Sequence, residues 1–571
     1  MSLRELGAND FYLSPKSILI TYMKTRHYLI LSILMLLPSI LLAEYSPNIR
    51  LNSDMDALIR RLATRYAIGL PTSMSFQPVA VADVHEFLER IDSLGKAGAL
   101  SQQETFQVQQ LRDLFIKPRR VAGWSNSKQD KSCYANISLL ASLDPRLRDS
   151  VSLRSRWQIS PSMSGNIGNL SFYSAIDVWT DWYTDSLFRG SDYQPYKGIP
   201  FNLYKRADSA PARSADLPRG GVRYTTDRVE LETGIDYLRI GPSVFYPLLL
   251  SGNAPPITYG RARWEIGPFE YIQMAGQLES QKDKAKFLYL HRLNISLWKQ
   301  RMTLGINEAV VNGSTTDEQG PLDSLNALRR DYYGQTRSWE WAYLIPFVPY
   351  KFSEHYLGDR DNAFISFDGE MRFPQRHRMY FEFLIDDMTS PWTFLSSDWG
   401  NKWALTAGCQ YFGSFHGKDL TSTIEYSRVE PWVYTHFYGG SHRYTHFDQC
   451  LGMPLGPNSD ALVIAVEGQI NPRNTVGLRL TNTRKGTDRG SNIADVFQDS
   501  LFLDNGKLYP SKHPDSPRKT FLGPGTLSST RLGVSWKLAP FGVFKIDALV
   551  EYDFASRTKG AYGHIFGGLV F

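Results

Sequence analysis

Residues 378–387 have the sequence RMYFEFLIDD, and this stretch indicates the fold of the chain. Its apolar and polar side chains alternate, with Met379, Phe381, Phe383 and Ile385 on one side and Arg378, Tyr380, Glu382 and Asp386 on the other. Successive side chains of a β-strand point to opposite faces, so the pattern predicts a strand with one apolar and one charged face. Residues 473–483, 531–537 and 545–554 repeat it.

The alternation begins near residue 133 and continues to the end of the chain. A strand with its share of two connections takes roughly 24 residues, so residues 133–571 allow about 18 strands, with 16 as the alternative because single-chain barrels have even strand counts. We therefore predict a mainly β protein, a transmembrane antiparallel β-barrel whose lumen is polar and hydrated. A soluble β-sandwich also has alternating strands and is the competing interpretation.

Three features favour the membrane barrel over the sandwich. The alternating region is long and shows no sign of a second core. Aromatic residues gather near predicted strand ends, as at Trp179, Trp182 and Tyr183, where an interfacial girdle would lie. The last residue is Phe571, on an alternating stretch, which resembles the insertion signal of bacterial outer-membrane barrels.

The first 43 residues are expected to form a leader that the mature protein lacks. Lys24 and Arg26 precede an apolar stretch at 28–42, and the small residue Ala43 follows it. This order is that of a secretory signal peptide, covering about residues 23–43, and the apolar stretch is short for a spanning helix. A single N-terminal membrane anchor is the alternative. The chain is thus predicted to be exported to the outer membrane of a bacterial cell.

Residues 48–118 differ from the rest and predict a small helical domain. Apolar residues recur at helical spacing in 56–66 and 81–91, and Ser101 with Glu104 forms a capping box before a third helix. A domain this small needs a larger partner, so we expect it to dock on the barrel as a periplasmic plug. Residues 117–132 are expected to be a linker.

Composition excludes several function classes. The chain has 63 basic and 57 acidic residues, which is too balanced for a nucleic-acid binder. Its three cysteines, Cys133, Cys409 and Cys450, lie far apart and form neither a disulfide framework nor a metal knuckle. We expect no cofactor and no metal.

Two groups of residues could bind a metal or act in catalysis, and each also has a purely structural interpretation. His442 and His446 have ligand-like spacing, but no Glu accompanies them, so an exposed loop rich in polar aromatics is favoured. Glu382 and Asp386 share the lumenal face at roughly 13 Å, too far apart for a glycosidase pair from one strand. Charge balance with Arg378 is favoured, and we predict no catalytic residue.

Aromatic residues beside planar hydrogen-bonding groups are typical of sugar-binding surfaces. Such groups occur at Arg261, Arg263 and Trp264, at Arg337 and Trp339, and at Asp361 and Asn362. Each group alone is also explained by a membrane girdle or strand-end packing. Together they predict a polysaccharide-binding surface.

Several segments resemble one known family. Residues 240–256 read IGPSVFYPLLLSGNAPP, and this stretch resembles the most recognisable segment of the capsule assembly protein Wzi family. Further similarity follows in the same order at 287–294 (FLYLHRLN), 305–311 (GINEAVV), 381–387 (FEFLIDD), 420–434 (LTSTIEYSRVEPWVY) and 444–460. The chain departs from the family pattern at Ile240 and Gly252, where members often have Trp and Asp. Residues 248–256 are interpreted either as a strand end and tight turn or as a ligand contact.

The resemblance implies an outer-membrane barrel of about 18 strands with a small helical domain on the periplasmic side. It also implies a lectin-like role, in which the protein retains or assembles capsular or other exported polysaccharide at the cell surface. The candidate contacts are Asn253, Arg261, Arg263, Trp264, Arg337, Trp339, Asp361, Asn362, Glu382 and Asp386. The alternative is a porin-like or oligosaccharide-conducting channel. Expected partners are a surface polysaccharide and outer-membrane lipid, and we expect a monomer.

Overall fold

The computed structural model describes most of residues 48–570. Its undescribed residues are 1–47, 50–53, 67, 70–71, 97, 103, 110–121, 127–130, 148–150, 184–201, 205–211, 227, 280–284, 315–337, 359–360, 374–375, 437–438, 496–500, 505–506, 511–516, 539–543, 555–558 and 571. The predicted leader at 1–43 lies outside the described residues.

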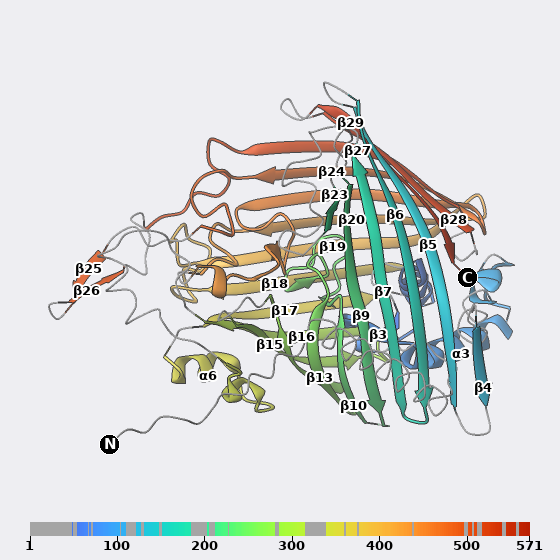
Figure 1. The fold of residues 1–571 in the computed structure, drawn as a ribbon, viewed down its shortest axis with the longest axis horizontal. Helices are drawn as coiled ribbons and strands as arrows, with labels where there is room; N and C mark the ends of the chain where they lie inside the picture. Colours follow the sequence, from blue (N-terminus) through green and yellow to red (C-terminus); the bar gives the residue numbers. More distant parts are fainter. Residues whose placement is uncertain are drawn as a thin grey trace, which may run out of the picture.

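Eighteen antiparallel strands form a closed barrel (Figure 1). In chain order they are β5 (Lys131–Leu147), β6 (Val151–Ile167), β7 (Leu170–Tyr183), β9 (Ala212–Thr225), β10 (Val229–Asp236), β13 (Ile257–Ile266), β14 (Phe269–Gln277), β15 (Lys286–Leu297), β16 (Met302–Gly313), β17 (Asn362–Arg372), β18 (His377–Asp387), β19 (Lys402–Phe415), β20 (Lys418–Val429), β23 (Ser459–Asn471), β24 (Asn474–Lys485), β27 (Leu527–Leu538), β28 (Phe544–Asp553) and β29 (Gly560–Val570). Pairing of β29 with β5 closes the circuit. The fold class predicted from the alternation is confirmed.

Three short strand pairings lie beside this circuit. β4 (Ala122–Asn126) pairs with the start of β5, and β8 (Asn202–Tyr204) pairs with the start of β9. β25 (Leu501–Asp504) and β26 (Lys507–Pro510) form a separate hairpin. β4 occupies part of the segment predicted as a linker, and the first barrel strand begins at Lys131, slightly earlier than predicted.

Where a strand has one apolar and one charged face, the apolar face points away from the lumen. Phe381 is 42% exposed and Val550 is 56% exposed, whereas Glu382, next to Phe381, is 3% exposed. Because adjacent residues of a strand face opposite sides, this contrast places the apolar residues outside and the charged ones inside. The two-faced character predicted from the sequence is confirmed.

The two ends of the barrel differ in the length of their connections. At one end the turns are short, as at 168–169, 267–268 and 416–417. At the other end the connections are long, as at 430–458 and 486–526. Outer-membrane barrels have short turns on the periplasmic side and long loops outside.

The N-terminal residues form a compact helical unit. α2 (Asp54–Arg65) and α3 (Val81–Lys96) pack with a further helix at 104–109 around their own apolar core. The predicted capping box is confirmed, because the N–H of Ser101 donates to the Glu104 carboxylate at 2.8 Å and the N–H of Glu104 donates to Ser101 Oγ at 3.2 Å. Among the described residues, no helix is long and apolar enough to cross a membrane.

This unit joins the barrel through a small sheet. β1 (Asn48–Ile49) pairs with β3 (Val79–Ala80) within the unit. After the short helix η2 (Thr72–Ser75), β2 (Phe76–Gln77) pairs with β11 (Arg239–Ile240), which pairs with β12 (Leu250–Ser251). Because β11 and β12 belong to the connection between β10 and β13, this sheet links the two parts.

Charged contacts join the helices to the short-turn end of the barrel. Arg65 forms an ion pair with Asp419 of β20, next to the turn at 416–417. Arg61 Nη1 donates to the side-chain oxygen of Gln469 in β23 at 3.2 Å. Arg90 of α3 donates at 3.0 Å to Gln300, in the turn between β15 and β16. The helices therefore reach several neighbouring turns of the same end.

The lumen has two different halves. Along β24, β27 and β28 it is polar, with Arg479 and Arg531 more than one-third exposed beside Glu551 and Asp553, as predicted. Across β13 to β20 the predicted hydrated lumen is wrong, because an apolar cluster fills it. That cluster combines inward wall residues with two connections that fold into the barrel, and it includes Phe76, Leu248, Leu249, Leu250, Ile272, Leu288, Leu290, Val433, Tyr434, Leu451 and Met453.

Candidate functional site

The first infolded connection, residues 237–256, is held by two wall carboxylates. Glu382 of β18 accepts the backbone N–H of Ser243 at 2.9 Å and that of Leu248 at 2.8 Å. Glu425 of β20 accepts three consecutive backbone N–H groups, of residues 244–246, at 2.7 to 3.0 Å. Charge-assisted bonds of this kind are about twice as strong as neutral ones. Glu382 therefore faces the lumen, as predicted, but contacts the protein's own backbone.

The second infolded connection, residues 430–458, packs on the first. Asp386 accepts the backbone N–H of Tyr434 at 2.6 Å, and Tyr434 Oη donates to the carbonyl of Leu248 at 2.7 Å. The N–H of Ser251 donates to the carbonyl of Leu451 at 2.8 Å. The buried run at 248–250 is thus part of a packed core, which supports the structural interpretation of this stretch.

The histidines of the second connection lie inside the barrel. The sequence predicted an exposed loop here, and this is wrong, because His442 is fully buried and His446 is 3% exposed. Short strands β21 (Thr445–His446) and β22 (Gln449–Cys450) and a turn of helix, η7 (Gly439–Ser441), shape this segment. The described residues hold no group of three His, Cys, Asp or Glu side chains placed for a metal ion.

His446 bonds through both ring nitrogens to the backbone of the barrel connections. Nδ1 accepts the N–H of Glu279 at 2.9 Å, and Nε2 donates to the carbonyl of Pro256 at 3.1 Å. These contacts fit the neutral ring with its proton on Nε2. Burial lowers the pKa of His446 to about 4, from an ordinary value of 6.5.

We expect acid to loosen this segment. Between pH 6.5 and pH 4 the unpacked histidine binds a proton and the packed one does not, so packing weakens as the pH falls, by about 2 kcal/mol at pH 5. Hydrogen exchange of amides 439–450, corrected for intrinsic rates, should be markedly faster at pH 5 than at pH 7.5. His446→Gln keeps a donor and an acceptor and should abolish the difference. An equal pH response in this variant would contradict the assignment to His446.

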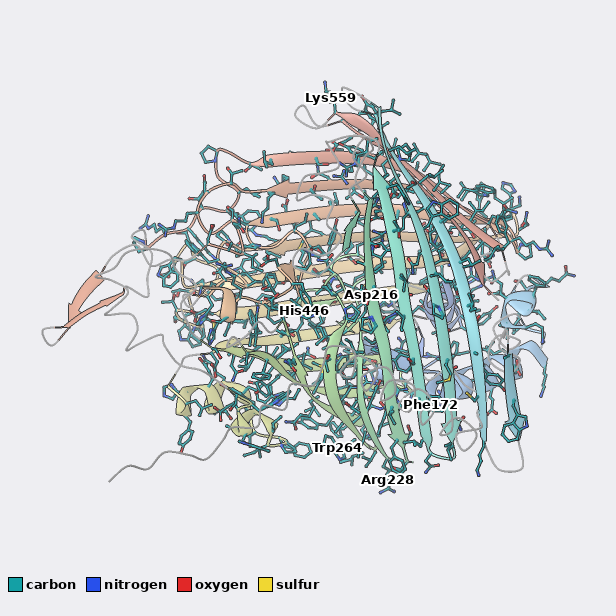
Figure 2. All side chains as sticks on the ribbon, viewed as in Figure 1. Phe172, Asp216, Arg228, Trp264, His446 and Lys559 are labelled. Carbon is teal, nitrogen blue, oxygen red and sulfur yellow. The ribbon has the colours of Figure 1, made fainter. Side chains whose placement is uncertain are left out.

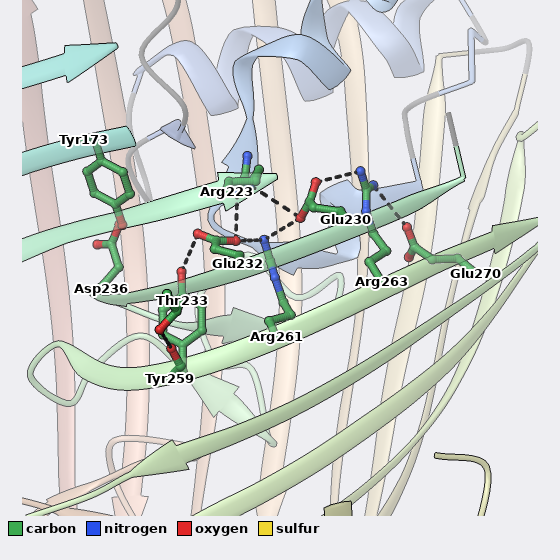
Figure 3. A network of polar contacts seen from close by, with 10 residues as sticks. All are labelled: Tyr173, Arg223, Glu230, Glu232, Thr233, Asp236, Tyr259, Arg261, Arg263 and Glu270. Atoms are coloured by element: carbon green, nitrogen blue, oxygen red, sulfur yellow. Dashed lines mark hydrogen bonds and ion pairs between the residues drawn. The ribbon is translucent and has the colours of Figure 1, made fainter. Parts of the chain in front are cut away.

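Arg261 and Arg263 belong to a charge ladder on the inner wall (Figure 3). Arg263 pairs with Glu230 at 2.9 Å, and Arg261 bridges Glu230 at 3.1 Å and Glu232. The ladder extends to Arg223 on β9 and Glu270 on β14. Three guanidinium and three carboxylate groups alternate, so this part of the wall is close to neutral.

The helical unit covers this ladder. The Phe76 ring lies 5.1 Å from the Arg261 guanidinium, and Asn294 donates to Ser75 Oγ at 3.0 Å. All six ladder side chains are less than 9% exposed. The ladder therefore forms part of the surface on which β2 packs.

Trp264 lies on the opposite face of the wall from Arg261 and Arg263. It follows Arg263 directly in β13 and so points out of the barrel. Its ring lies 5.7 Å from Tyr271 and 6.2 Å from Phe347, both on the outer side of the wall. The wall itself separates the predicted group of Arg261, Arg263 and Trp264.

Asp361 and Asn362 lie buried at the long-loop end of β17. Asn362 Nδ2 donates to the carbonyl of His442 at 2.8 Å, and Asp361 accepts from Tyr343 Oη at 2.8 Å. Asn362 thus holds the rim to the second infolded connection, and Asp361 holds it to the connection between β16 and β17.

The remaining predicted contacts lie at separate places. Asn253 is half-buried in the first infolded connection, and its N–H donates to Ser251 Oγ at 3.3 Å. Trp339 is 40% exposed, with its ring 4.5 Å from Phe287. Arg337 lies outside the described residues. The predicted contacts therefore do not gather on one surface.

The long loops form one bonded cluster, with Asn458 at its centre. Asn458 accepts the N–H of Gly486 on its carbonyl at 2.8 Å and that of Leu522 on Oδ1 at 2.7 Å, and its Nδ2 donates to Ser491 at 2.7 Å. Its φ of 53° lies in the left-handed region that Asn tolerates. Lys519 adds an ion pair to Glu430 at 2.9 Å. Two of the long connections, 430–458 and 486–526, are thereby held together at this end of the barrel.

One aromatic residue that the sequence interpretation missed projects from this end. Trp392, in the connection between β18 and β19, is 93% exposed. Its loop is shaped by buried Asn401, which accepts the N–H of Thr389 at 3.0 Å and donates to the carbonyl of Thr393 at 2.7 Å. The N–H of Trp399 donates to the carbonyl of Pro517 at 3.1 Å and ties the loop to the cluster. A rigid loop thus presents a bare indole ring at the outer end.

Comparison with known proteins gives the fold a counterpart. No protein-family model matches the chain, and no curated protein matches it by sequence. Among solved structures, Wzi from Escherichia coli superposes over 93% of this chain and 100% of its own, with a TM-score of 0.54 and 12% identity. The chain has the fold of that outer-membrane β-barrel. Wzi is described as a carbohydrate-binding β-barrel involved in group 1 capsule assembly.

Two barrels from Pseudomonas aeruginosa superpose less well. OccK8 (OprE) is 7% identical and has a TM-score of 0.41, over 77% of this chain and 98% of its own. OccK2 (OpdF), solved in complex with glucuronate, is 8% identical and has a TM-score of 0.39, over 76% of this chain and 96% of its own.

Proposed function

We propose that this protein resides in the bacterial outer membrane and binds a capsular or other exported polysaccharide, which it helps to retain or assemble at the cell surface. In this proposal it acts as a monomer and binds without catalysis. Residues 1–43 serve as the export leader, and residues 48–118 form a periplasmic plug-like domain.

The observation that carries the proposal is the filled half of the barrel. Residues 237–256 and 430–458 occupy the lumen across β13 to β20, and charged side chains fix them to the wall and to each other. This packing narrows the path that a conducting channel needs. A binding platform does, because fixed loops lose less conformational entropy when they bind a ligand.

The sequence resemblance supports the same function. The segments that resemble the Wzi family include 240–256 and 444–460, which lie in the two infolded connections. The description of the E. coli counterpart as carbohydrate-binding agrees with this. Membership of the Wzi family is part of the proposal.

Trp392 is the contact that we propose first. An exposed indole offers a flat apolar face to the CH groups of a sugar ring, and the serine and aspartate residues of its loop offer hydrogen bonds. Trp339, also exposed, is a second candidate. For Glu382, Asp386, Asp361 and Asn362 we propose a positioning role, since their polar groups already bind the fold. A polymer meets such weak contacts repeatedly, so avidity multiplies them.

The test is binding of purified surface polysaccharide to the detergent-solubilised protein. Loss of one stacking contact costs about 1 kcal/mol per site, so Trp392→Ala should weaken binding of a short oligosaccharide about fivefold and of the polymer more. Trp536→Ala, on the outward face of β27, is the matched control and should bind as the wild type does. Absence of polysaccharide binding by the wild type would refute the proposed function. Binding that Trp392→Ala leaves unchanged would refute only the contact.

A further inference from the structure

A segment of one long connection lies against the outside of the barrel. Residues 338–358, with η6 (Trp341–Leu344) and α6 (Tyr350–Tyr356), cover the outward side chains of β14 to β16. We call these residues the strap. In Figure 1 α6 lies outside the barrel wall, in yellow.

The strap satisfies polar groups that would otherwise face lipid. Gln273 donates to the carbonyl of Tyr343 at 3.0 Å, and Glu308 accepts the N–H of Tyr350 at 2.7 Å while it pairs with His291 at 2.6 Å. A buried polar group without a partner is destabilising, so the wall beneath the strap requires this cover. The strap is therefore a fixed part of the outer wall.

The free side of the strap is mainly apolar. Its exposed large apolar side chains include Trp341, Ile345, Phe347, Phe352 and Tyr356, at 54% to 87% exposure, beside the exposed Lys351, which pairs with Glu354. An exposed apolar surface of this size indicates contact with a nonpolar environment. On a barrel whose outer wall is apolar, that environment is the lipid of the membrane.

A groove runs between the strap and the neighbouring strands. It has a volume of about 500 Å³, with Leu344 and Pro346 of the strap on one side and Val222, Tyr224 and Leu231 on the other. Its size is within the usual range of ligand sites, about 300–1,000 Å³.

The floor of the groove is made of small side chains. Thr233, Gly260, Ala262 and Ala275 lie on neighbouring strands β10, β13 and β14 and point outward. A Cβ added to Gly260 would meet no atom within 4 Å, so the space above it is open. The groove is thus a recess in the lipid-facing wall itself.

The position of the groove along the strands indicates which leaflet of the membrane it faces. Leu170 follows the short turn at 168–169, and Trp264 lies three residues before the turn at 267–268. Tyr224 lies at the same end of β9, and Figure 2 places Trp264 near Arg228 of the adjacent turn. Short turns mark the periplasmic side, where the leaflet consists of phospholipid.

We propose that this groove binds an acyl chain of a phospholipid from the inner leaflet of the outer membrane. The chain lies along the floor formed by Gly260 and Ala262, between the strap and β9. An acyl chain is surrounded by apolar groups both in the groove and among bulk lipid, so the preference for the groove comes from its shape. The site is separate from the proposed polysaccharide contacts at the opposite end.

Photocrosslinking in lipid nanodiscs tests the proposal. The full-length protein is reconstituted with phosphatidylethanolamine that carries a diazirine on one acyl chain, and crosslinked peptides are quantified by mass spectrometry. We expect peptides covering 257–277 and 338–347 to be labelled at least fivefold more, per exposed apolar residue, than those of β27 to β29. Gly260→Leu fills the groove and should remove this excess.

Two controls keep the result decisive. Gly567→Leu adds the same side chain to an outward glycine of β29 that also faces open space, and it should leave the labelling unchanged. Ala262→Leu is a second filling variant if Gly260→Leu does not fold. Even labelling around the barrel, or an excess that both filling variants retain, would overturn the proposal. Stronger labelling by a diazirine lipid A would overturn the assignment to phospholipid.

Discussion

Replacing Glu425 with alanine is expected to release residues 244–246 from the wall and to widen the path through the barrel. The substitution removes the acceptor of three backbone N–H groups and of Tyr380 Oη, which donates at 2.7 Å. Leaving three partly buried N–H groups and the buried Tyr380 hydroxyl unpaired costs roughly 3 kcal/mol or more. The strands keep their backbone hydrogen bonds, so the barrel itself should persist.

Single-channel recordings in planar bilayers measure this effect. The wild type should show few small steps, and Glu425→Ala should show frequent large ones. Glu551→Ala is the matched control: it removes an inward carboxylate that binds Arg479 of another strand at 2.7 Å and no infolded segment. Large steps in the wild type would instead favour the porin alternative. Equal traces for the two variants would show that Glu425 does not hold the segment.

The barrel was predictable because the pleat of a strand imposes period two on any wall between lipid and water. Where both faces of a strand are buried in the protein, apolar and polar residues no longer alternate. Residues 287–290 read FLYL, apolar on both faces, because Leu288 and Leu290 pack on the infolded core while Phe287 and Tyr289 pack under the strap. A strand buried on both faces has this continuous apolar character. The continuous apolar run therefore indicated that this strand is covered on both faces, by the infolded core and by the strap, and the sequence interpretation did not use this signal.

The candidate contacts were less predictable, because proximity in sequence is not proximity in space. Arg263 and Trp264 are adjacent, yet the pleat places them on opposite sides of the wall. Glu382 and Asp386 share the lumenal face, as predicted, but the backbone that they bind comes from connections far away in the sequence. Trp392 has no patterned neighbours, and only the fold shows that its ring is bare.

Replacing Phe76 with alanine is expected to detach the helical unit from the barrel. The helical unit has its own apolar core, and Phe76 does not belong to it. Phe76 is only 1% exposed because its ring inserts into the apolar cluster of the infolded connections. Truncation of a buried Phe costs about 3–5 kcal/mol. Here the loss falls on the contact between two parts, so each part should keep its own fold.

Limited proteolysis of the reconstituted protein separates the two outcomes. In Phe76→Ala, cleavage within 66–80 and 97–103 should become faster by about two orders of magnitude, since each 1.4 kcal/mol is a factor of ten, while the heat-modifiable mobility of the barrel is retained. Phe106→Ala removes the same ring from an exposed position of the third helix and should leave cleavage almost unchanged. Neither substitution removes a group that forms the ion pair of Arg65 with Asp419 or the backbone pairing of β2 with β11. If Phe76→Ala resists cleavage as the wild type does, these polar contacts alone are sufficient, and the apolar cluster does not hold the two parts together.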